Sequence, residues 1–245
     1  MAVIPYFKFS VSIFLFIISI LCYCQSRYPG EEEQVISLLK PGLSGGISVE
    51  EALNQRRSVR DYTKDPLSLT QISQLCWAAQ GVTKKMEKPF WFPEDREWIG
   101  GLKTAPSAGA LYPLEIYLVV GDAETLPAGL YQYMPARHVL KKNHSKDLRE
   151  PLTTAALNQD FLLKVGVVMV ITGIYERTSS KYGDRAVRYV HMEVGAVCQN
   201  VALQCESLGL STVYVGAFED EQVSQVLGLP DNEHPLAILP LGKKQ

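Results

Sequence analysis

The densest group of cations in the chain is the run Arg56-Arg57-Ser58-Val59-Arg60. Three guanidinium groups this close together need an anion to offset their charge. Arginine suits phosphate because its planar fork of donors matches two oxygens at once, and the serine hydroxyl adds a neutral donor. The run therefore indicates a phosphate site, with a solvated charged corner at a helix end as the alternative.

Two segments of small residues are the next candidates for ligand contact. The first, Ala105–Pro113, reads Ala-Pro-Ser-Ala-Gly-Ala-Leu-Tyr-Pro and precedes an apolar run. The second contains Gly216 and Ala217. Small side chains let a backbone approach a flat ligand closely, although either segment could be an ordinary turn. A nucleophilic role for Ser107 is the weaker interpretation, because the segment lacks the Gly-x-Ser-x-Gly pattern.

The sequence does not indicate a metal site or a disulfide framework. The four histidines show no ligand spacing, and no Cys-x-x-Cys pair occurs. Cys198 and Cys205 are seven residues apart on a predicted helix and would share one face. We expect these two thiols and Cys76 to be buried and structural.

Composition favours one globular domain with a substantial core. The chain has 245 residues, 47% of them hydrophobic, and a formal net charge of -2. It contains no long basic run, so nucleic acid is not an expected partner. A small-molecule substrate is the expectation instead.

The N-terminus differs from the rest of the chain. Residues 9–21 are almost wholly apolar, which is short for a bilayer span but fits the core of a signal peptide. We therefore expect residues 1–24 to be a signal peptide or an uncleaved N-terminal anchor, and the protein to be exported to the periplasm or the extracellular space. Membrane contact is expected only through an uncleaved leader. Residues 25–47, rich in Gly, Pro and Glu, would form a loose mature N-terminus.

The elements that must position these residues can be predicted from periodicity. The capping-box patterns at Ser48 and Ser68 predict helices that end near Gln55 and Gly81. Residues 82–104 show no clear period and predict a long surface loop. Beyond this loop, strands are predicted at 114–120, 129–133, 139–141, 165–173, 213–215 and 237–241, and helices at 145–163, 190–208 and 220–227. This irregular alternation predicts an α+β sandwich over residues 48–245.

The order of these motifs resembles the nitroreductase superfamily, and within it the SagB/ThcOx-type dehydrogenases. The likeness covers roughly residues 48–243, and residues 106–117 and 181–200 carry most of its specificity. The resemblance implies a nitroreductase-like fold, with a mixed, mostly antiparallel sheet between helices, in a homodimer. It also implies an oxidoreductase that transfers electrons or hydride through non-covalently bound FMN by a ping-pong route. NAD(P)H is a candidate co-substrate.

The resemblance also implies a role for each matched residue. The phosphate, the ribityl chain and the pyrimidine edge of FMN would be held by Arg56, Arg57, Ser58 and Arg60, with Lys243 near the phosphate. Backbone close to the flavin ring would come from Pro106, Ser107, Ala108, Gly109, Gly216 and Ala217. Lys181 and Tyr182 match a pair that azoline-oxidising relatives use to handle protons, so they are the expected catalytic residues. A helix-start salt bridge is the alternative role for that pair.

Two departures from the family pattern concern the substrate more than the cofactor. Lys103 stands where relatives commonly have arginine, and the loop at 84–101 carries Trp91, Phe92 and Trp98 and is longer than a minimal version. A non-catalytic flavin-binding or substrate-binding protein is the alternative function. NAD(P)H is scarce outside the cytoplasm, so an exported member would need another electron donor.

Overall fold

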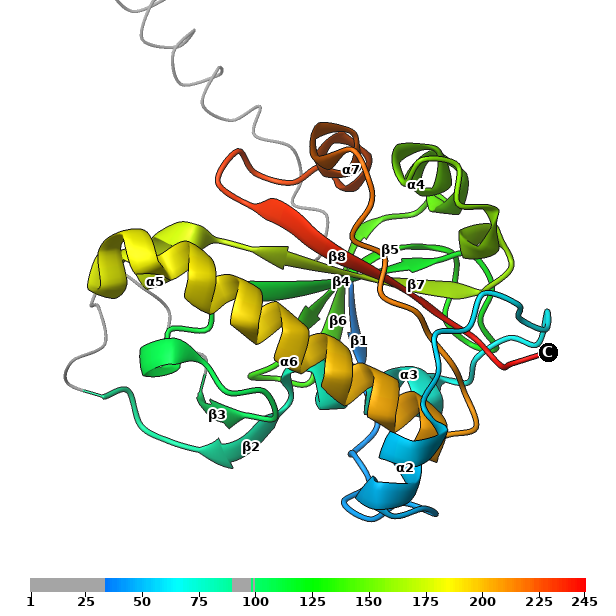
Figure 1. The fold of residues 1–245 in the computed structure, drawn as a ribbon, viewed down its shortest axis with the longest axis horizontal. Helices are drawn as coiled ribbons and strands as arrows, with labels where there is room; N and C mark the ends of the chain where they lie inside the picture. Colours follow the sequence, from blue (N-terminus) through cyan, green and yellow to red (C-terminus); the bar gives the residue numbers. More distant parts are fainter. Residues whose placement is uncertain (1–33, 90–97, 99) are drawn as a thin grey trace, which may run out of the picture. The chain divides into compact units, whose positions relative to one another are not determined.

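The structure is a computed structural model that describes residues 34–89, 98 and 100–245 (Figure 1). The expected leader at 1–24, its apolar segment at 9–21 and the aromatic positions Trp91 and Phe92 lie outside these residues. Among the residues that are described, no helix is long and apolar enough to cross a membrane.

A six-stranded sheet forms the centre of the unit from Val35 to Gln245. Its strand order is β1-β6-β5-β4-β7-β8, and every neighbouring pair is antiparallel. The strands are β1 (Val35–Ser37), β4 (Leu114–Val120), β5 (Gly129–Met134), β6 (Val139–His144), β7 (Val167–Gly173) and β8 (His234–Leu241). The predicted mostly antiparallel sheet is therefore confirmed.

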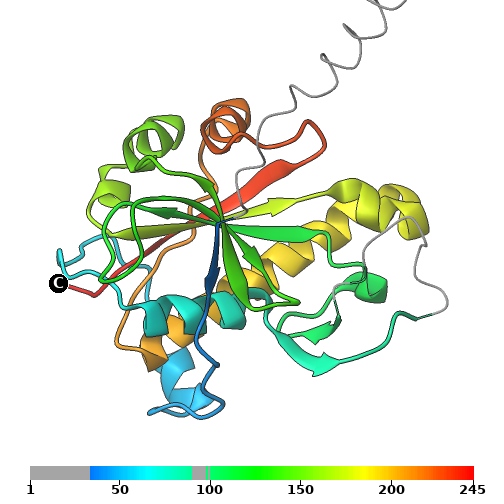
Figure 2. The same ribbon diagram turned by 180° about the vertical axis from the view of Figure 1, so that it is seen from behind.

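Helices cover both faces of this sheet, as Figures 1 and 2 show from opposite sides. The helices are α2 (Val49–Gln55), α3 (Leu69–Gln80), α4 (Arg149–Ala155), α5 (Tyr175–Tyr182), α6 (Ala186–Ser207) and α7 (Asp220–Leu227). Alternate side chains of β4 point to opposite faces. Ile116 and Leu118 pack in the core with α3 and α6, whereas Tyr117 and Val119 pack in the core with α4 and α7. Burial on both faces explains why β4 and β7 are largely apolar along their whole length, and the predicted α+β sandwich is confirmed.

Local sequence signals set several helix ends as predicted. Ser68 and Gln71 form both halves of a capping box at the start of α3. The Ser48 hydroxyl accepts a hydrogen bond from the Glu51 backbone N–H at 3.0 Å. Gly228 ends α7 in the left-handed conformation, with φ 65°. These side chains and this glycine satisfy backbone groups that have no partner inside the helix.

Two expectations about irregular regions are wrong. The loop predicted over 82–104 contains an antiparallel pair, β2 (Val82–Lys85) and β3 (Gly101–Lys103). Three of the four β2 residues are exposed, so no apolar pattern marked this strand. Residues 35–37 of the expected loose N-terminus form edge strand β1, which pairs with β6.

Two further predicted elements are shorter than expected. The helix predicted over 145–163 is divided into α4 and a 3-10 helix, η2 (Asp160–Leu163). Leu157 and Asn158 separate them with left-handed φ values of 58° and 57°, which an α-helix cannot accommodate. The strand predicted at 213–215 is an isolated bridge, in which Val215 and Ile238 exchange two backbone hydrogen bonds.

Candidate functional site

The arginine run lies at the end of α2 and keeps two uncompensated cations. Arg56 is the C-cap residue of α2. The Arg57 guanidinium turns back and donates 2.8 Å hydrogen bonds to the carbonyl oxygens of Asn54 and Arg56. The Arg60 guanidinium lies 5.9 Å from the centre of the Phe161 ring. Within the described part of the chain, neither Arg56 nor Arg60 forms an ion pair with a carboxylate, so both charges are available to an anion.

The C-terminal tail runs beside this segment. The Thr63 N–H donates to the Lys243 carbonyl at 3.0 Å, and Tyr62 forms an antiparallel bridge with Lys244. The Lys243 ammonium lies 3.6 Å from the Asp65 carboxylate, with both side chains partly exposed to solvent. A pair this exposed contributes little energy, so it leaves the ammonium able to turn toward another anion.

The turn at Gly216 and Ala217 is connected to the same region. The Ala217 carbonyl accepts a 2.8 Å hydrogen bond from the Gln159 side chain, which lies just before η2 and Phe161. Gly216 is exposed, and a Cβ atom built on it would meet nothing within 4 Å. We call Arg56–Arg60 together with Gly216 and Ala217 the arginine cluster.

The segment before β4 forms a second group, held by an acidic side chain that the sequence analysis missed. The Glu193 carboxylate on α6 accepts hydrogen bonds from the Ser107 hydroxyl at 3.0 Å and from the Ala108 N–H at 2.8 Å. The Ser107 oxygen in turn accepts a 2.8 Å hydrogen bond from the Tyr112 N–H. Glu193 lies among the buried valines of α6 and is 5% exposed. An acidic residue at a core-facing helical position was the available signal.

Lys181 and Tyr182 lie against this second group. A Cβ atom built on Gly109 would be 2.9 Å from the Tyr182 hydroxyl oxygen and 3.1 Å from the Lys181 ammonium nitrogen. The Tyr182 ring also packs edge-on against Tyr189, with ring centres 5.1 Å apart. The structure therefore brings the predicted catalytic pair to the predicted flavin turn. We call Pro106–Gly109 together with Lys181 and Tyr182 the turn cluster.

Burial changes the ionisation of two groups beside the turn cluster. It lowers the pKa of Lys103 from 10.5 to about 7, against the opposing effects of Glu115 and Glu193. It raises the pKa of Glu193 from 4.5 to about 6, although hydrogen bonds from Ala108 and Ser107 oppose the change. Perturbed groups of this kind are typical of functional sites.

The two clusters lie at opposite ends of α6 in one chain. Ser58 pairs with Thr212, which follows the C-terminal end of α6, whereas the turn cluster is bonded to Glu193 near its N-terminal end. At 1.5 Å per residue, Glu193 and Ser207 are separated by about 20 Å along the helix. Figure 1 shows α2 and α5 at these two ends. The predicted FMN ligands therefore form two groups, and their roles remain predictions.

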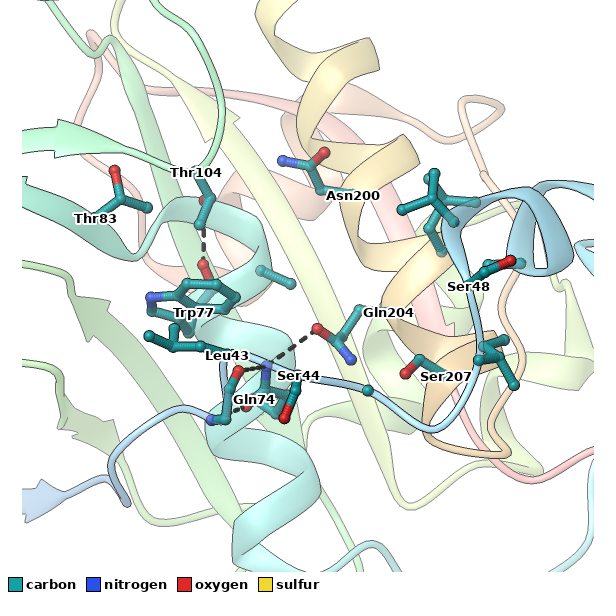
Figure 3. Close-up of a pocket in the computed structure, with 17 residues that line it drawn as sticks. Leu43, Ser44, Ser48, Gln74, Trp77, Thr83, Thr104, Asn200, Gln204 and Ser207 are labelled. Carbon is teal, nitrogen blue, oxygen red and sulfur yellow. Dashed lines mark hydrogen bonds between the residues drawn. The ribbon is translucent and has the colours of Figure 1, made fainter.

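A cavity of about 440 Å³ lies between α2, α3 and α6 (Figure 3). None of its 17 lining residues is charged, and none belongs to either cluster. Trp77 forms part of its wall, and the Gln74 side chain donates 3.1 Å hydrogen bonds to the Gly42 carbonyl and to the Gln204 side chain. Leu43 and Val49, at its rim, are 81% and 64% exposed. An apolar rim of this kind is typical of an interaction surface.

No group of three or more His, Cys, Asp or Glu side chains that could hold a metal ion occurs in the described residues. Cys76, Cys198 and Cys205 are buried free thiols, as predicted.

Comparisons with known proteins agree on one family. The family model described as the nitroreductase family matches residues 53–243. A nitroreductase-like protein of Methanocaldococcus jannaschii is 44% identical over 198 residues, covering 81% of this chain and 92% of that protein. The microcin B17-processing protein McbC of Escherichia coli is 26% identical over 205 residues, covering 78% of this chain and 70% of McbC.

A solved structure supports the same assignment. The crystal structure of a nitroreductase-like protein from Ralstonia eutropha superimposes with a TM-score of 0.72 at 29% identity. The match covers 88% of this chain and 92% of that one. The fold, the matched residues and the relatives together show that this chain belongs to the nitroreductase family of oxidoreductases.

Proposed function

We propose that the protein is an FMN-dependent oxidoreductase of the SagB-type branch of this family. The observation that carries the proposal is the pair Arg56 and Arg60, whose charges have no carboxylate partner in the described residues. A phosphate would offset both charges, and the segment from Gln159 to Phe161 contacts both Arg60, through the Phe161 ring, and Ala217, next to Gly216. A site with a cationic end and an open backbone turn fits a phosphorylated, planar cofactor.

Bound FMN would supply the hydride or electron transfer, and the chain would supply binding and proton handling. Arg56 and Arg60 hold the phosphate in this proposal, and Gly216 gives the ring system room against the backbone. Lys181 and Tyr182 hold or deliver a proton at the Gly109 turn. The likeness to McbC, a microcin-processing protein, supports the SagB-type assignment, and a small-molecule substrate is proposed.

We also propose that the site is completed in a homodimer. One chain holds the arginine cluster and the turn cluster at opposite ends of α6, so a second copy is needed to place them on one cofactor. Leu43 and Val49, which line the uncharged cavity of Figure 3, are 81% and 64% exposed, and Leu53 of the adjoining helix α2 is 52% exposed. Burying such side chains against a partner is favourable by about 25 cal/mol per Å² of apolar surface.

Export remains a proposal that rests on the apolar stretch at 9–21. Fractionation of cells that express the full chain and a variant lacking residues 1–24 tests it. The full chain should leave the cytoplasm and the shortened chain should stay there. Equal distribution of the two would refute the leader assignment.

The central experiment is anaerobic reduction of the purified protein after reconstitution with FMN. We expect a yellow protein with one FMN per chain, whose visible oxidised-flavin absorption bleaches with NADH, NADPH or another donor. Bleaching followed by reoxidation with a second substrate supports the enzyme. A flavin that binds but is never reduced by any donor supports a non-catalytic flavin-binding protein, and failure to bind FMN refutes both the enzyme and the flavin-binding alternative.

A further inference from the structure

Only one oxygen of the Glu193 carboxylate forms hydrogen bonds within the described residues. Its Oε1 atom accepts both hydrogen bonds from the turn cluster, from the Ser107 hydroxyl and the Ala108 N–H. Its Oε2 atom is buried and has no hydrogen-bond partner in the described residues. A buried carboxylate oxygen without a partner is costly, so a purely structural role would be better served by a neutral side chain.

The turn that Glu193 holds has an unusual backbone. Gly109, Ala110 and Tyr112 have left-handed φ values of 62°, 53° and 46°. Non-glycine residues adopt this conformation only where the surroundings impose it, and such turns are concentrated at functional sites. Glu193 supplies two of the bonds that impose it, and the Arg177 guanidinium supplies a third by donating to the Tyr112 carbonyl at 3.1 Å.

Charged groups face Glu193 from the elements around it. Lys103 of β3 is 9% exposed, and its ammonium lies 4.7 Å from the centre of the Tyr112 ring. It forms no ion pair with Glu193 within 4.0 Å, so it offsets the carboxylate only from a distance. Arg177 of α5 forms an ion pair with Glu115 of β4, and both charges act on Lys103.

On the other side of the turn, Lys181 and Tyr182 approach Gly109. Tyr112 links the turn to Lys103, because its hydroxyl accepts a 3.1 Å hydrogen bond from the Lys103 backbone N–H. Glu193 is therefore the acidic group bonded directly to the turn, between a buried lysine and the predicted proton-handling pair.

We propose that Glu193 is a positioning residue of the FMN site, whose carboxylate fixes the Ser107–Gly109 turn and whose negative charge makes the bound flavin harder to reduce. The proposal rests on the FMN site proposed above. Burial raises the pKa of Glu193 to about 6, so the charge is present above this pH and is lost below it. A negative charge in a poorly solvated site opposes the gain of electrons by a nearby ring, because charge interactions are strong where water is excluded.

The test is the reduction potential of the FMN-loaded protein, measured by spectroelectrochemistry between pH 5 and pH 8. In the unmodified protein we expect an inflection near pH 6. Glu193→Gln should remove the inflection and, at pH 7.5 and a fixed applied potential, raise the ratio of reduced to oxidised flavin about tenfold. Glu193→Asp, which keeps the charge, should retain an inflection. Glu206→Gln, a change on the same helix away from the turn, should behave as the unmodified protein.

A second variant keeps the proposal testable if Glu193→Gln does not fold. Ser107→Ala removes one hydrogen bond that favours the charged carboxylate, so the inflection should move to higher pH. The proposal is overturned if the reduction potential of Glu193→Gln, or that of Ser107→Ala, depends on pH in the same way as that of the unmodified protein. An unmodified protein that binds no FMN instead overturns the proposed function, so the two failures are distinguishable.

Discussion

Gly109 lies directly against the Tyr182 hydroxyl: a Cβ atom at position 109 would approach that oxygen to 2.9 Å. Its φ of 62° is also unfavourable for any residue with a side chain. Gly109→Ala should therefore displace the turn or Tyr182 and lower turnover about tenfold or more, with a stability loss of about 1 kcal/mol. Steady-state kinetics and thermal unfolding check both effects. Gly46→Ala is the control, since its Cβ would meet nothing within 4 Å; equal kinetics in the two variants would contradict the close packing.

Lys181→Ala tests proton handling without disturbing the arginine cluster. The variant should retain stoichiometric FMN, because Lys181 lies at the turn cluster, and its turnover should fall about 100-fold, as general acid–base groups contribute factors of this order. Absorbance measures the FMN content and single-turnover kinetics measures the rate, so cofactor binding and turnover are assessed separately. Lys146→Ala, a change at an exposed lysine elsewhere, should leave both unchanged. Unchanged kinetics in Lys181→Ala would assign the pair a structural role.

The arginine run offers its own control. Arg56→Ala and Arg60→Ala should each weaken FMN binding about 10- to 100-fold, because each removes a charge-assisted hydrogen bond worth about 1.5–3 kcal/mol. Arg57→Ala should weaken binding less, since its guanidinium is engaged with the Asn54 and Arg56 carbonyls. Fluorescence titration with FMN measures all three dissociation constants. The phosphate assignment fails if Arg57 proves the most important of the three.

The buried Lys103 predicts a defined dependence of stability on pH. The folded protein releases this proton near pH 7, whereas the unfolded chain retains it until about pH 10.5. Between these values the unfolded state binds more protons, so this residue makes stability rise with pH. Lys103→Met should stabilise the protein most below pH 7, and the gain should shrink as the pH rises toward 10.5. Melting temperatures from pH 6 to pH 9.5 check this, with exposed Lys84→Met as the control; identical slopes in the two variants would contradict it.

The apolar surface around α2 tests the dimer. Leu53 and Leu157 are both 52% exposed, but Leu53 belongs to α2 and Leu157 follows α4, two helices that Figure 1 shows on opposite sides of the sheet. Leu53→Asp should give a monomer that loses FMN, because the site needs both copies. Leu157→Asp should remain a dimer that binds FMN. Size-exclusion chromatography with light scattering measures both masses, and a dimeric Leu53→Asp variant would place the interface elsewhere.

Much of the architecture could be predicted because its signals are local. The apolar runs of β4 and β7 and the capping box at Ser68 identify their elements without tertiary information. Strands β1 and β2 were missed because they are short and contain no buried residue, so pairing with another strand rather than an apolar pattern defines them.

The sequence proposed the residues of both clusters, whose roles remain predictions, but it did not indicate the contacts that hold them. The residues of both clusters were identified by resemblance, whereas Glu193 was missed because its partner Ser107 is 86 positions away. An acidic residue on the apolar face of a helix indicates only that its buried carboxylate needs hydrogen-bond partners. Which turn it holds becomes visible only when the sheet brings β4 and α6 together.

The separation of the two clusters along α6 has a genetic consequence. In a symmetric dimer, each flavin site would take its arginines from one copy and its turn from the other. A chain damaged at Arg56 and a chain damaged at Lys181 would each have strongly reduced activity alone. Joined in one mixed dimer, they would place both defects in one site and leave the other intact. Co-expression of two defective alleles should therefore restore part of the activity that neither possesses.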